Sequence, residues 1–304
     1  MRRKILLSFE AAEREPDPAI QKEWMTFLIV GAGPTGVELA GTIGELARTT
    51  LKNDFRNIDT GRAEIILVEG RSHVLPSYPA ELSGKAEKAL GKLGVKIRLD
   101  TMVTEIKGNK VIISTNGVRE EILARTILWT AGVKASPLGR VLHDRAGAAL
   151  DNGGRVIVGP DLTVPGHPDI FVIGDLASFT PEGGEPLPGV APVAMQEGRY
   201  VAELIVNRLA GKETEPFKYA DKGNLAVIGR NAAVADLGRI RLSGFPAWLI
   251  WAFVHISYLI EFDSKVLVLF QWAWNYFTRK RGVRLITGEY PSSLIENKNG
   301  KTAE

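Results

Sequence analysis

The chain has 304 residues, of which 45% are hydrophobic and 24% are charged, and its formal net charge is +3. A chain of this length can form about two domains, and this composition excludes a disordered protein. The small charge gives no support for nucleic-acid binding. Because the sequence contains no cysteine, disulfides, thiolate chemistry and cysteine-ligated metal centres are excluded. Any electron transfer must therefore use an organic cofactor, such as nicotinamide or flavin.

The first segment is predicted to be a surface helix. Ile5, Phe9 and Ala12 recur at helical spacing, and the pattern ends before Pro16. The apolar stretch is far too short for a signal peptide, so no export signal is expected. A chain that opens on such a helix resembles the middle of a fold, and we expect its start to be truncated.

A βαβ unit is predicted next. Residues 25–30 form an apolar, β-rich run typical of a strand buried on both faces. Residues 34–50 have the spacing of a packed helix, and residues 64–68 form a second strand that ends on Glu69. The polar stretch 51–62 connects the helix to the second strand.

The remaining pattern alternates helices with short strands. The expected elements are a helix at 83–93, a strand at 95–99, an antiparallel hairpin of 110–114 and 120–123, and strands at 127–130, 156–158 and 170–173. A helix is expected at 194–209, followed by a strand-rich stretch over 217–241 and a tail dense in Trp, Phe and Leu. We find no internal repeat and no low-complexity tract.

Three glycines follow the first predicted strand in the pattern G-x-G-x-x-G: Gly31, Gly33 and Gly36. The first allows a tight turn, the second lets the backbone approach a pyrophosphate, and the third permits close helix packing. The pyrophosphate then lies on the free N–H groups at the start of the helix. Because this motif falls between a strand and a helix, it predicts a dinucleotide site.

Two acidic residues belong to this prediction. Glu69 ends the second strand, where a carboxylate binds ribose hydroxyls and repels a 2′-phosphate, so NADH is favoured over NADPH. Glu69 lies 38 positions after Gly31 where about 20 is usual, and the connection 51–62 explains the difference. Arg71 lies nearby and would suit the 2′-phosphate of NADPH. The alternative for Glu69 is a solvated residue at the end of a strand. Glu38 either favours the positive end of the helix dipole or points toward the nicotinamide.

Several separated strings resemble type II NADH:quinone oxidoreductases. They are GAGPTGVELAG at 31–41, LVEG at 67–70, LWTAGVKASPL at 128–138, IFVIGDLA at 170–177, PVAMQEG at 192–198 and KGNLAVIGR at 222–230. The resemblance runs from near residue 1 to about residue 288. Members of this family are peripheral-membrane flavoproteins in which NADH reduces FAD and FAD reduces a quinone, without proton pumping.

The resemblance implies a role for each residue of the nicotinamide site. Gly31, Gly33 and Gly36 would hold the pyrophosphate of NADH. Glu69 would bind its ribose, and Glu38 would approach the nicotinamide side.

The same resemblance implies an FAD site later in the chain. Ala131 and Gly132 would line the junction between nicotinamide and flavin. Gly174 and Asp175 would bind FAD, with the Asp175 carboxylate hydrogen-bonded to its ribityl or phosphate region. The alternative for Asp175 is a helix N-cap, which is worth about 1 kcal/mol.

Three further residues concern the flavin and the quinone. Gln196 matches a glutamine that lies between the flavin ring and the quinone, and Lys222 matches a lysine near the flavin, where its charge would stabilise reduced anionic flavin. Many members have a second glutamine where this chain has Glu197. An ionised, unpaired carboxylate beside an apolar quinone tunnel is costly, so Glu197 either turns outward or has a raised pKa.

The family begins with a separate FAD-binding G-x-G-x-x-G segment that this sequence lacks before Gly31. We therefore expect an α/β fold with two dinucleotide-binding Rossmann-like domains, the FAD one incomplete, and a C-terminal amphipathic helical region that associates with the membrane. The expected domains are 1–22, a remnant of the FAD domain with a connector; 23–127, the NADH-binding domain; 128–215, the second half of the FAD domain; and 216–304, the C-terminal domain. Such a chain is expected to bind NADH and to retain little FAD, which leaves its activity open.

Residues 245–260 and 266–277 are mostly apolar, but each is shorter than the roughly 20 residues of a spanning helix. Their Trp and Tyr side chains suit the headgroup region. Basic residues follow at Arg279, Lys280, Arg281 and Arg284. We predict two helices that lie in the membrane surface, with residues 245–284 in contact with lipid; a buried hairpin and a bent spanning helix through 245–270 are the alternatives.

The resemblance thus implies a peripheral NADH:quinone oxidoreductase on the cytoplasmic face of the inner membrane, with NADH and FAD as cofactors and a quinone as partner. A homodimer is left open. No metal site is expected, since the four histidines are scattered. A flavin disulfide reductase is excluded, because its chemistry needs a pair of cysteines. The remaining alternative is a non-catalytic NADH-binding module without flavin.

Overall fold

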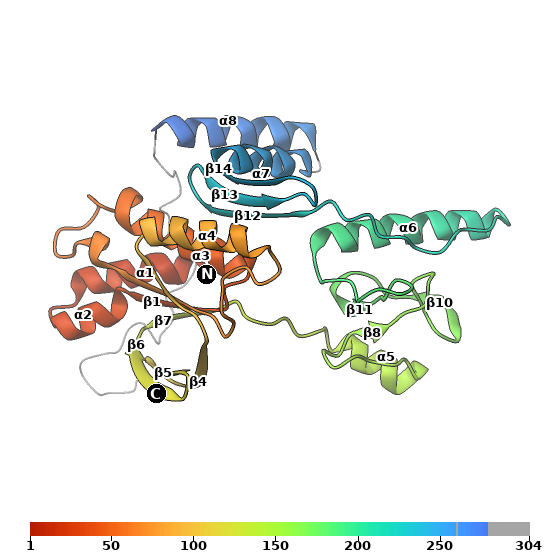
Figure 1. Ribbon diagram of the computed structural model, residues 1–304, viewed down its shortest axis with the longest axis horizontal. Coiled ribbons are helices and arrows are strands. Elements are labelled where there is room, and N and C mark those ends of the chain that lie inside the picture. The colour runs from red at the N-terminus through yellow and green to blue at the C-terminus, as the bar shows by residue number, and fades with distance from the viewer. Residues whose placement is uncertain (260, 279–304) are drawn as a thin grey trace, which may run out of the picture. The chain divides into compact units, whose positions relative to one another are not determined.

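The computed structural model describes residues 1–259 and 261–278 (Figure 1). The chain divides into two compact units. The first contains residues 1–131 together with the described residues from 223 onward, and the second contains residues 132–222. Each unit is described by itself below.

A four-stranded parallel sheet forms the centre of the first unit, with strand order β3-β2-β1-β7. The strands are β1 (Thr26–Val30), β2 (Glu64–Val68), β3 (Val95–Arg98) and β7 (Thr126–Trp129). The register pairs Val30 with Val68 on one side and with Trp129 on the other. The carboxyl ends of β1, β2 and β7 therefore meet at one edge of the sheet. The predicted strands at 25–30, 64–68, 95–99 and 127–130 are confirmed to within one residue.

Helices complete this α/β arrangement. They are α1 (Arg2–Arg14), α2 (Pro18–Trp24), α3 (Pro34–Glu45) and α4 (Ala80–Lys92), with a π-helix at Leu46–Thr50 and a 3₁₀ turn at Thr60–Arg62. The predicted helix 34–50 is correct in extent, but its last turn is π-helical, with a hydrogen bond from Leu51 N to Leu46 O at 2.9 Å. The predicted helix 83–93 begins three residues earlier than expected, directly after Pro79.

Helix α1 packs into the main hydrophobic core of the first unit. The Phe9 ring is fully buried and lies 5.1 Å from the Phe27 ring of β1 and 6.3 Å from the Phe55 ring. Ile5, Leu6 and Ala12 belong to the same core. The apolar face that the sequence predicted for this helix is therefore covered by the sheet and the segment after α3.

A second, antiparallel sheet covers residues 101–123 with the order β4-β5-β6. Its strands are β4 (Thr101–Lys107), β5 (Lys110–Thr115) and β6 (Val118–Leu123). The predicted hairpin of 110–114 and 120–123 is confirmed, but β4 was not predicted. Most of β4 is exposed, so its sequence lacks the alternation of apolar and polar residues by which a strand is recognised.

The second unit contains short strands and one long helix. Its elements are α5 (Leu138–Ala146), β8 (Val156–Ile157), β9 (Thr163–Val164), β10 (His167–Phe171), a 3₁₀ turn η3 (Gly174–Leu176), β11 (Ala177–Ser178) and α6 (Ala191–Leu209). The strand predicted at 170–173 is corrected to 167–171, where it pairs antiparallel with β9. Helix α6 starts three residues before the predicted helix, because Pro192 fits its first turn.

The C-terminal part of the first unit is a three-stranded antiparallel sheet followed by two helices (Figure 1). The elements are β12 (Asn224–Gly229), β13 (Ala232–Asp236), β14 (Arg241–Gly244), α7 (Phe245–Ser257) and α8 (Phe262–Thr278). Trp251 of α7 stacks on Trp272 of α8 with ring centroids 5.4 Å apart. The strand-rich stretch was predicted from residue 217, but its first strand begins at Asn224.

No helix in the part of the chain that the structure describes is both long and apolar enough to cross a membrane. Large apolar side chains are nevertheless exposed on α7 and α8; they include Phe253, Phe262, Phe270, Trp274 and Phe277. The basic residues Arg279, Lys280, Arg281 and Arg284 of the predicted lipid contact lie outside the described residues.

Candidate functional site

The glycine turn lies between β1 and α3, at the edge where the parallel strands end. Gly31 has a φ of +99°, and its N–H donates a 2.8 Å hydrogen bond to the carbonyl oxygen of Val68. A Cβ atom on Gly31 would lie 2.7 Å from the Cβ atom of Ala131. Both the backbone conformation and the close approach of Ala131, just after β7, therefore require glycine here.

The other two glycines differ in what surrounds them. A Cβ atom on Gly36 would collide with the carbonyl oxygen of Gly31, so this glycine allows close packing. Gly33 is the N-cap residue of α3, and nothing lies within 4 Å of the place where its Cβ would be. The open space thus lies at the N-cap of a helix, whose first N–H groups have no partner within the helix, and a dinucleotide pyrophosphate binds at a place of this kind.

Glu69 lies directly beside this turn. One carboxylate oxygen accepts a 2.6 Å hydrogen bond from the N–H of Ala32, and the other accepts a 3.0 Å bond from the N–H of Arg71. The side chain is half-buried. It is therefore bonded to the glycine turn, at the position from which a carboxylate reaches a ribose; ribose binding itself stays a prediction.

Glu38 projects from α3 toward the C-terminal sheet. Its carboxylate accepts a 3.3 Å hydrogen bond from the N–H of Val227 on β12. Burial raises the pKa of Glu38, and this shift is partly opposed by the Val227 hydrogen bond and by the charge of His255 on α7. Glu38 thus connects the dinucleotide helix to the C-terminal elements, and its approach to a nicotinamide stays a prediction.

The raised pKa of Glu38 predicts a change in the pH dependence of stability in the variant Glu38→Gln. As the pH rises above the ordinary pKa of glutamate, the unfolded chain loses this proton before the folded chain does, so wild-type stability falls. The melting temperature of E38Q relative to wild type should therefore increase as the pH rises above the ordinary pKa of glutamate, about 4.3. Glu203→Gln on the exposed surface of α6 is the control; a difference that is constant with pH for E38Q would contradict this prediction.

In the second unit, Gly174 and Asp175 form the start of the 3₁₀ turn η3. Gly174 has a φ of +68°, and its N–H donates a 2.5 Å hydrogen bond to the carboxylate of Glu197. The Asp175 side chain is exposed. The alternative of a helix N-cap is not observed for Asp175, because Ile173 precedes η3 and Val190 precedes α6 at the N-cap positions. The exposed carboxylate at this turn can accept hydrogen bonds from a ligand hydroxyl.

The side chain of Glu197 turns inward and is only 1% exposed. Burial raises the pKa of Glu197; the Gly174 hydrogen bond opposes the shift and the charge of Asp175 adds to it. Of the two alternatives given by the sequence, an outward turn is therefore wrong, and a raised pKa is confirmed. The hydrogen-bond partner of Glu197 was not predicted, because Gly174 lies 23 positions earlier in the chain.

Gln196 and Lys222 lie close to the same short segment. The Gln196 amide donates a 3.0 Å hydrogen bond to the carbonyl oxygen of Ala220 and accepts one of 3.0 Å from the N–H of Ala220. Lys222, two residues later, is exposed. Gln196 thus fixes the segment that carries Lys222.

The predicted site residues fall into two groups. The first unit brings together Gly31, Gly33, Gly36, Glu38, Glu69 and Ala131, whereas the second contains Gly132, Gly174, Asp175, Gln196 and Lys222. Gly132 has a φ of +69°, which a side chain would disfavour.

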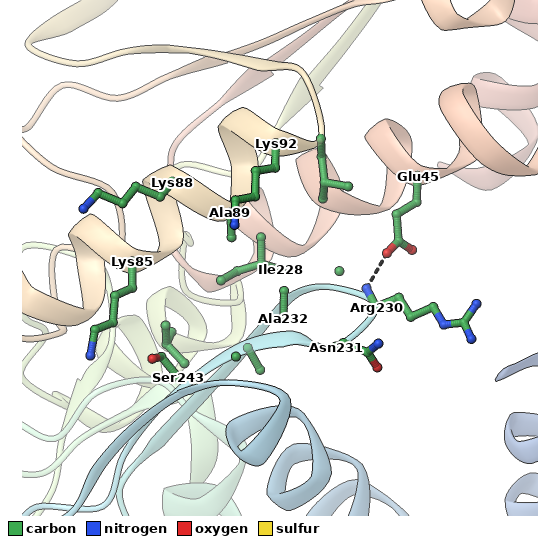
Figure 2. A pocket seen from close by; sticks show the side chains of 15 residues that line it. Glu45, Lys85, Lys88, Ala89, Lys92, Ile228, Arg230, Asn231, Ala232 and Ser243 are labelled. Carbon is green, nitrogen blue, oxygen red and sulfur yellow. Dashed lines mark hydrogen bonds between the residues drawn. The ribbon is translucent and has the colours of Figure 1, made fainter.

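A separate pocket of about 410 Å³ was not predicted (Figure 2). Lys85, Lys88 and Lys92 of α4 line one side, and Arg230 and Asn231 of the β12–β13 turn line the other. Lysines three and seven positions apart on a predicted helix were the only sequence signal for it. None of the predicted site residues lines this pocket.

The chain matches two family models. The model described as pyridine nucleotide-disulphide oxidoreductase matches residues 5–198, and the model of the NDH2 C-terminal domain matches residues 222–281. The type II NADH:quinone oxidoreductase Ndh of Mycobacterium tuberculosis is 45% identical over 293 residues, which cover 95% of this chain and 62% of that protein. NdhA of the same organism is 40% identical over 295 residues, with the same two coverages. The chain thus spans less than two thirds of the length of these relatives.

The structure of NDH2 from Plasmodium falciparum in complex with NADH superposes with a TM-score of 0.82 at 18% identity, covering 94% of this chain and 72% of that chain. At this identity the superposition shows the shared fold. A NAD-dependent persulfide reductase from A. fulgidus superposes less well, with a TM-score of 0.52 over 69% of this chain and 35% of that chain.

Proposed function

We propose, since this chain belongs to the type II NADH:quinone oxidoreductase family, that it binds NADH at the turn from Gly31 to Gly36 and takes part in the transfer of its electrons through FAD to a quinone. The observation that carries this proposal is the open space beside Gly33, which is the N-cap residue of α3. The pyrophosphate would lie there, and Glu69 would bind the adenosine ribose. Glu38 and Ala131 would face the nicotinamide.

The residues of the second unit fit a flavin. Gly174 and Asp175 would hold the ribityl or phosphate region, and Gly132 would lie at the junction with the nicotinamide. Bound there, FAD would supply a hydride acceptor for NADH and an electron donor for the quinone. Gln196 would lie between flavin and quinone, and the exposed charge of Lys222 would stabilise negative charge on the flavin. Residues 128–215 would thus form part of a second Rossmann-like domain.

Helices α7 and α8 support membrane association. They expose Phe253 and Phe270 to 73% and 70%, and Trp274 to 69%, and bulky side chains of this kind enter the headgroup region of a bilayer. We infer that these helices lie on the membrane surface, as a peripheral protein on the cytoplasmic face of the inner membrane would require. A quinone dissolved in lipid would then be within reach.

The function is tested by measuring NADH binding first and quinone reduction second. NADH fluorescence should change on titration with the chain, and NADH oxidation with added FAD and quinone-containing vesicles should exceed the rate of the same mixture without protein. Failure to bind NADH would contradict the proposal. Binding without quinone reduction would instead favour a non-catalytic NADH-binding module.

Membrane association is tested with Phe253→Asp combined with Phe270→Asp. Each phenylalanine loses about 1.5–3 kcal/mol of burial in lipid, so binding to anionic vesicles should weaken at least about tenfold in a sedimentation assay. Val118→Asp on β6, where the side chain is 72% exposed, is the control. Equal binding by the double variant and the control would show that the lipid contact lies elsewhere.

A further inference from the structure

Glu197 is the one carboxyl or basic side chain that is buried among residues 1–259 and 261–278. It lies in α6, a helix held in the second unit by the buried side chains of Val193, Val201 and Leu204. Burying an ionised carboxylate away from water is costly, so a buried carboxyl group is usually protonated or hydrogen-bonded. A carboxyl in such a place therefore needs a structural reason.

The hydrogen bond of Glu197 provides that reason. Its carboxylate oxygen lies 2.5 Å from the backbone nitrogen of Gly174. Gly174 begins η3, a turn of only three residues without a side-chain cap, and has a positive φ. So short a turn has little stability of its own. The bond from the Gly174 N–H to a long helix therefore fixes the turn from outside.

The surroundings also favour a neutral carboxyl. Burial and the negative charge of Asp175 both raise the pKa of Glu197. A protonated carboxyl still accepts the Gly174 hydrogen bond through its carbonyl oxygen, without adding a second negative charge beside Asp175. Glutamine has the same shape and the same acceptor, so it should perform the same task.

We propose that Glu197 is a positioning residue, whose hydrogen bond to Gly174 fixes the η3 turn and so holds Asp175 in place to bind FAD. The part that concerns FAD rests on the proposed function. Glu197 acts from inside the unit, so this inference differs from direct contact with a quinone. It predicts that the acceptor oxygen matters and the negative charge does not.

The test compares Glu197→Gln with Glu197→Met, which has a similar length but no oxygen acceptor. Amide hydrogen exchange at Gly174 is measured on the full chain without flavin, and FAD binding is measured by the quenching of FAD fluorescence on titration. E197M should exchange Gly174 at least about tenfold faster and bind FAD about tenfold more weakly. E197Q should restore both values to within about twofold of wild type. Glu203→Met, on the exposed side of α6, is the matched control.

Each outcome separates the two proposals. Unchanged exchange in E197M, or fast exchange in a folded E197Q, would overturn the positioning role. Fast exchange in E197M with rescue by E197Q would support the positioning role. If the wild-type chain did not quench FAD fluorescence, the proposed flavin site would fail, but the exchange result would still support the role of Glu197 in fixing the turn. If E197M did not fold, fast exchange at Gly174 in a folded E197Q would still overturn the positioning role.

Discussion

Replacing Gly33 with alanine should leave the stability of the chain nearly unchanged but weaken NADH binding by at least about tenfold. The backbone at Gly33 has a φ of −67°, which alanine adopts freely, and its Cβ would meet nothing within 4 Å. The added methyl group would instead occupy the space into which the pyrophosphate must come. A fluorescence titration with NADH, together with a thermal melt, measures both quantities.

Gly84→Ala in α4 is the matched control, because its Cβ also meets nothing within 4 Å. This variant should gain up to about 1 kcal/mol of helix stability without any change in NADH affinity. Unaltered NADH affinity in G33A would mean that the pyrophosphate does not lie at this turn. Gly36→Ala should behave differently from both, because its Cβ would strike the Gly31 carbonyl and disturb the turn itself.

Replacing Phe9 with alanine should lower the free energy of unfolding by about 3–5 kcal/mol. The Phe9 ring is completely buried against the rings of Phe27 and Phe55, and the neighbouring side chains can close the resulting cavity only in part. Urea unfolding of the chain measures the change. The loss is expected although α1 is the first element of the chain and precedes the glycine turn.

The control for Phe9 is Phe253→Ala, a change of the same side chain at a position that is 73% exposed. In the absence of lipid its effect should stay within about 0.5 kcal/mol. A loss of less than about 1 kcal/mol for F9A would show that α1 does not pack on the sheet as described.

Helix α1 also illustrates which parts of the fold could be predicted from the sequence. The spacing of Ile5, Phe9 and Ala12 predicted the helix and its apolar face. It did not predict that Phe27 and Phe55 cover this face, because periodicity indicates which residues are buried and not what buries them. The exposed strand β4 was missed for a related reason, since a strand without a buried face has no apolar pattern.

In the candidate site, the features predicted correctly are those formed by residues that are neighbours in the sequence. The strand, the glycine turn and the helix that follow one another from residue 26 to residue 45 were predicted correctly, because the glycine spacing is required by the turn itself. The partners of Glu38, Glu197 and Gln196 were not predicted. Each forms its hydrogen bond with a backbone group 23 or more positions away, and only the folded chain brings these groups together.

The parallel register that pairs Val30 with Val68 has a consequence for the evolution of this site. Once β2 enters the sheet in that register, Glu69 is placed beside Ala32 whatever the length of the chain between them. Each doubling of a flexible loop costs only about 0.6 kcal/mol of closure entropy. Insertions at the exposed residues 52–53 are therefore nearly neutral for the position of Glu69, so its distance from the glycines along the sequence can change while its distance in space stays constant.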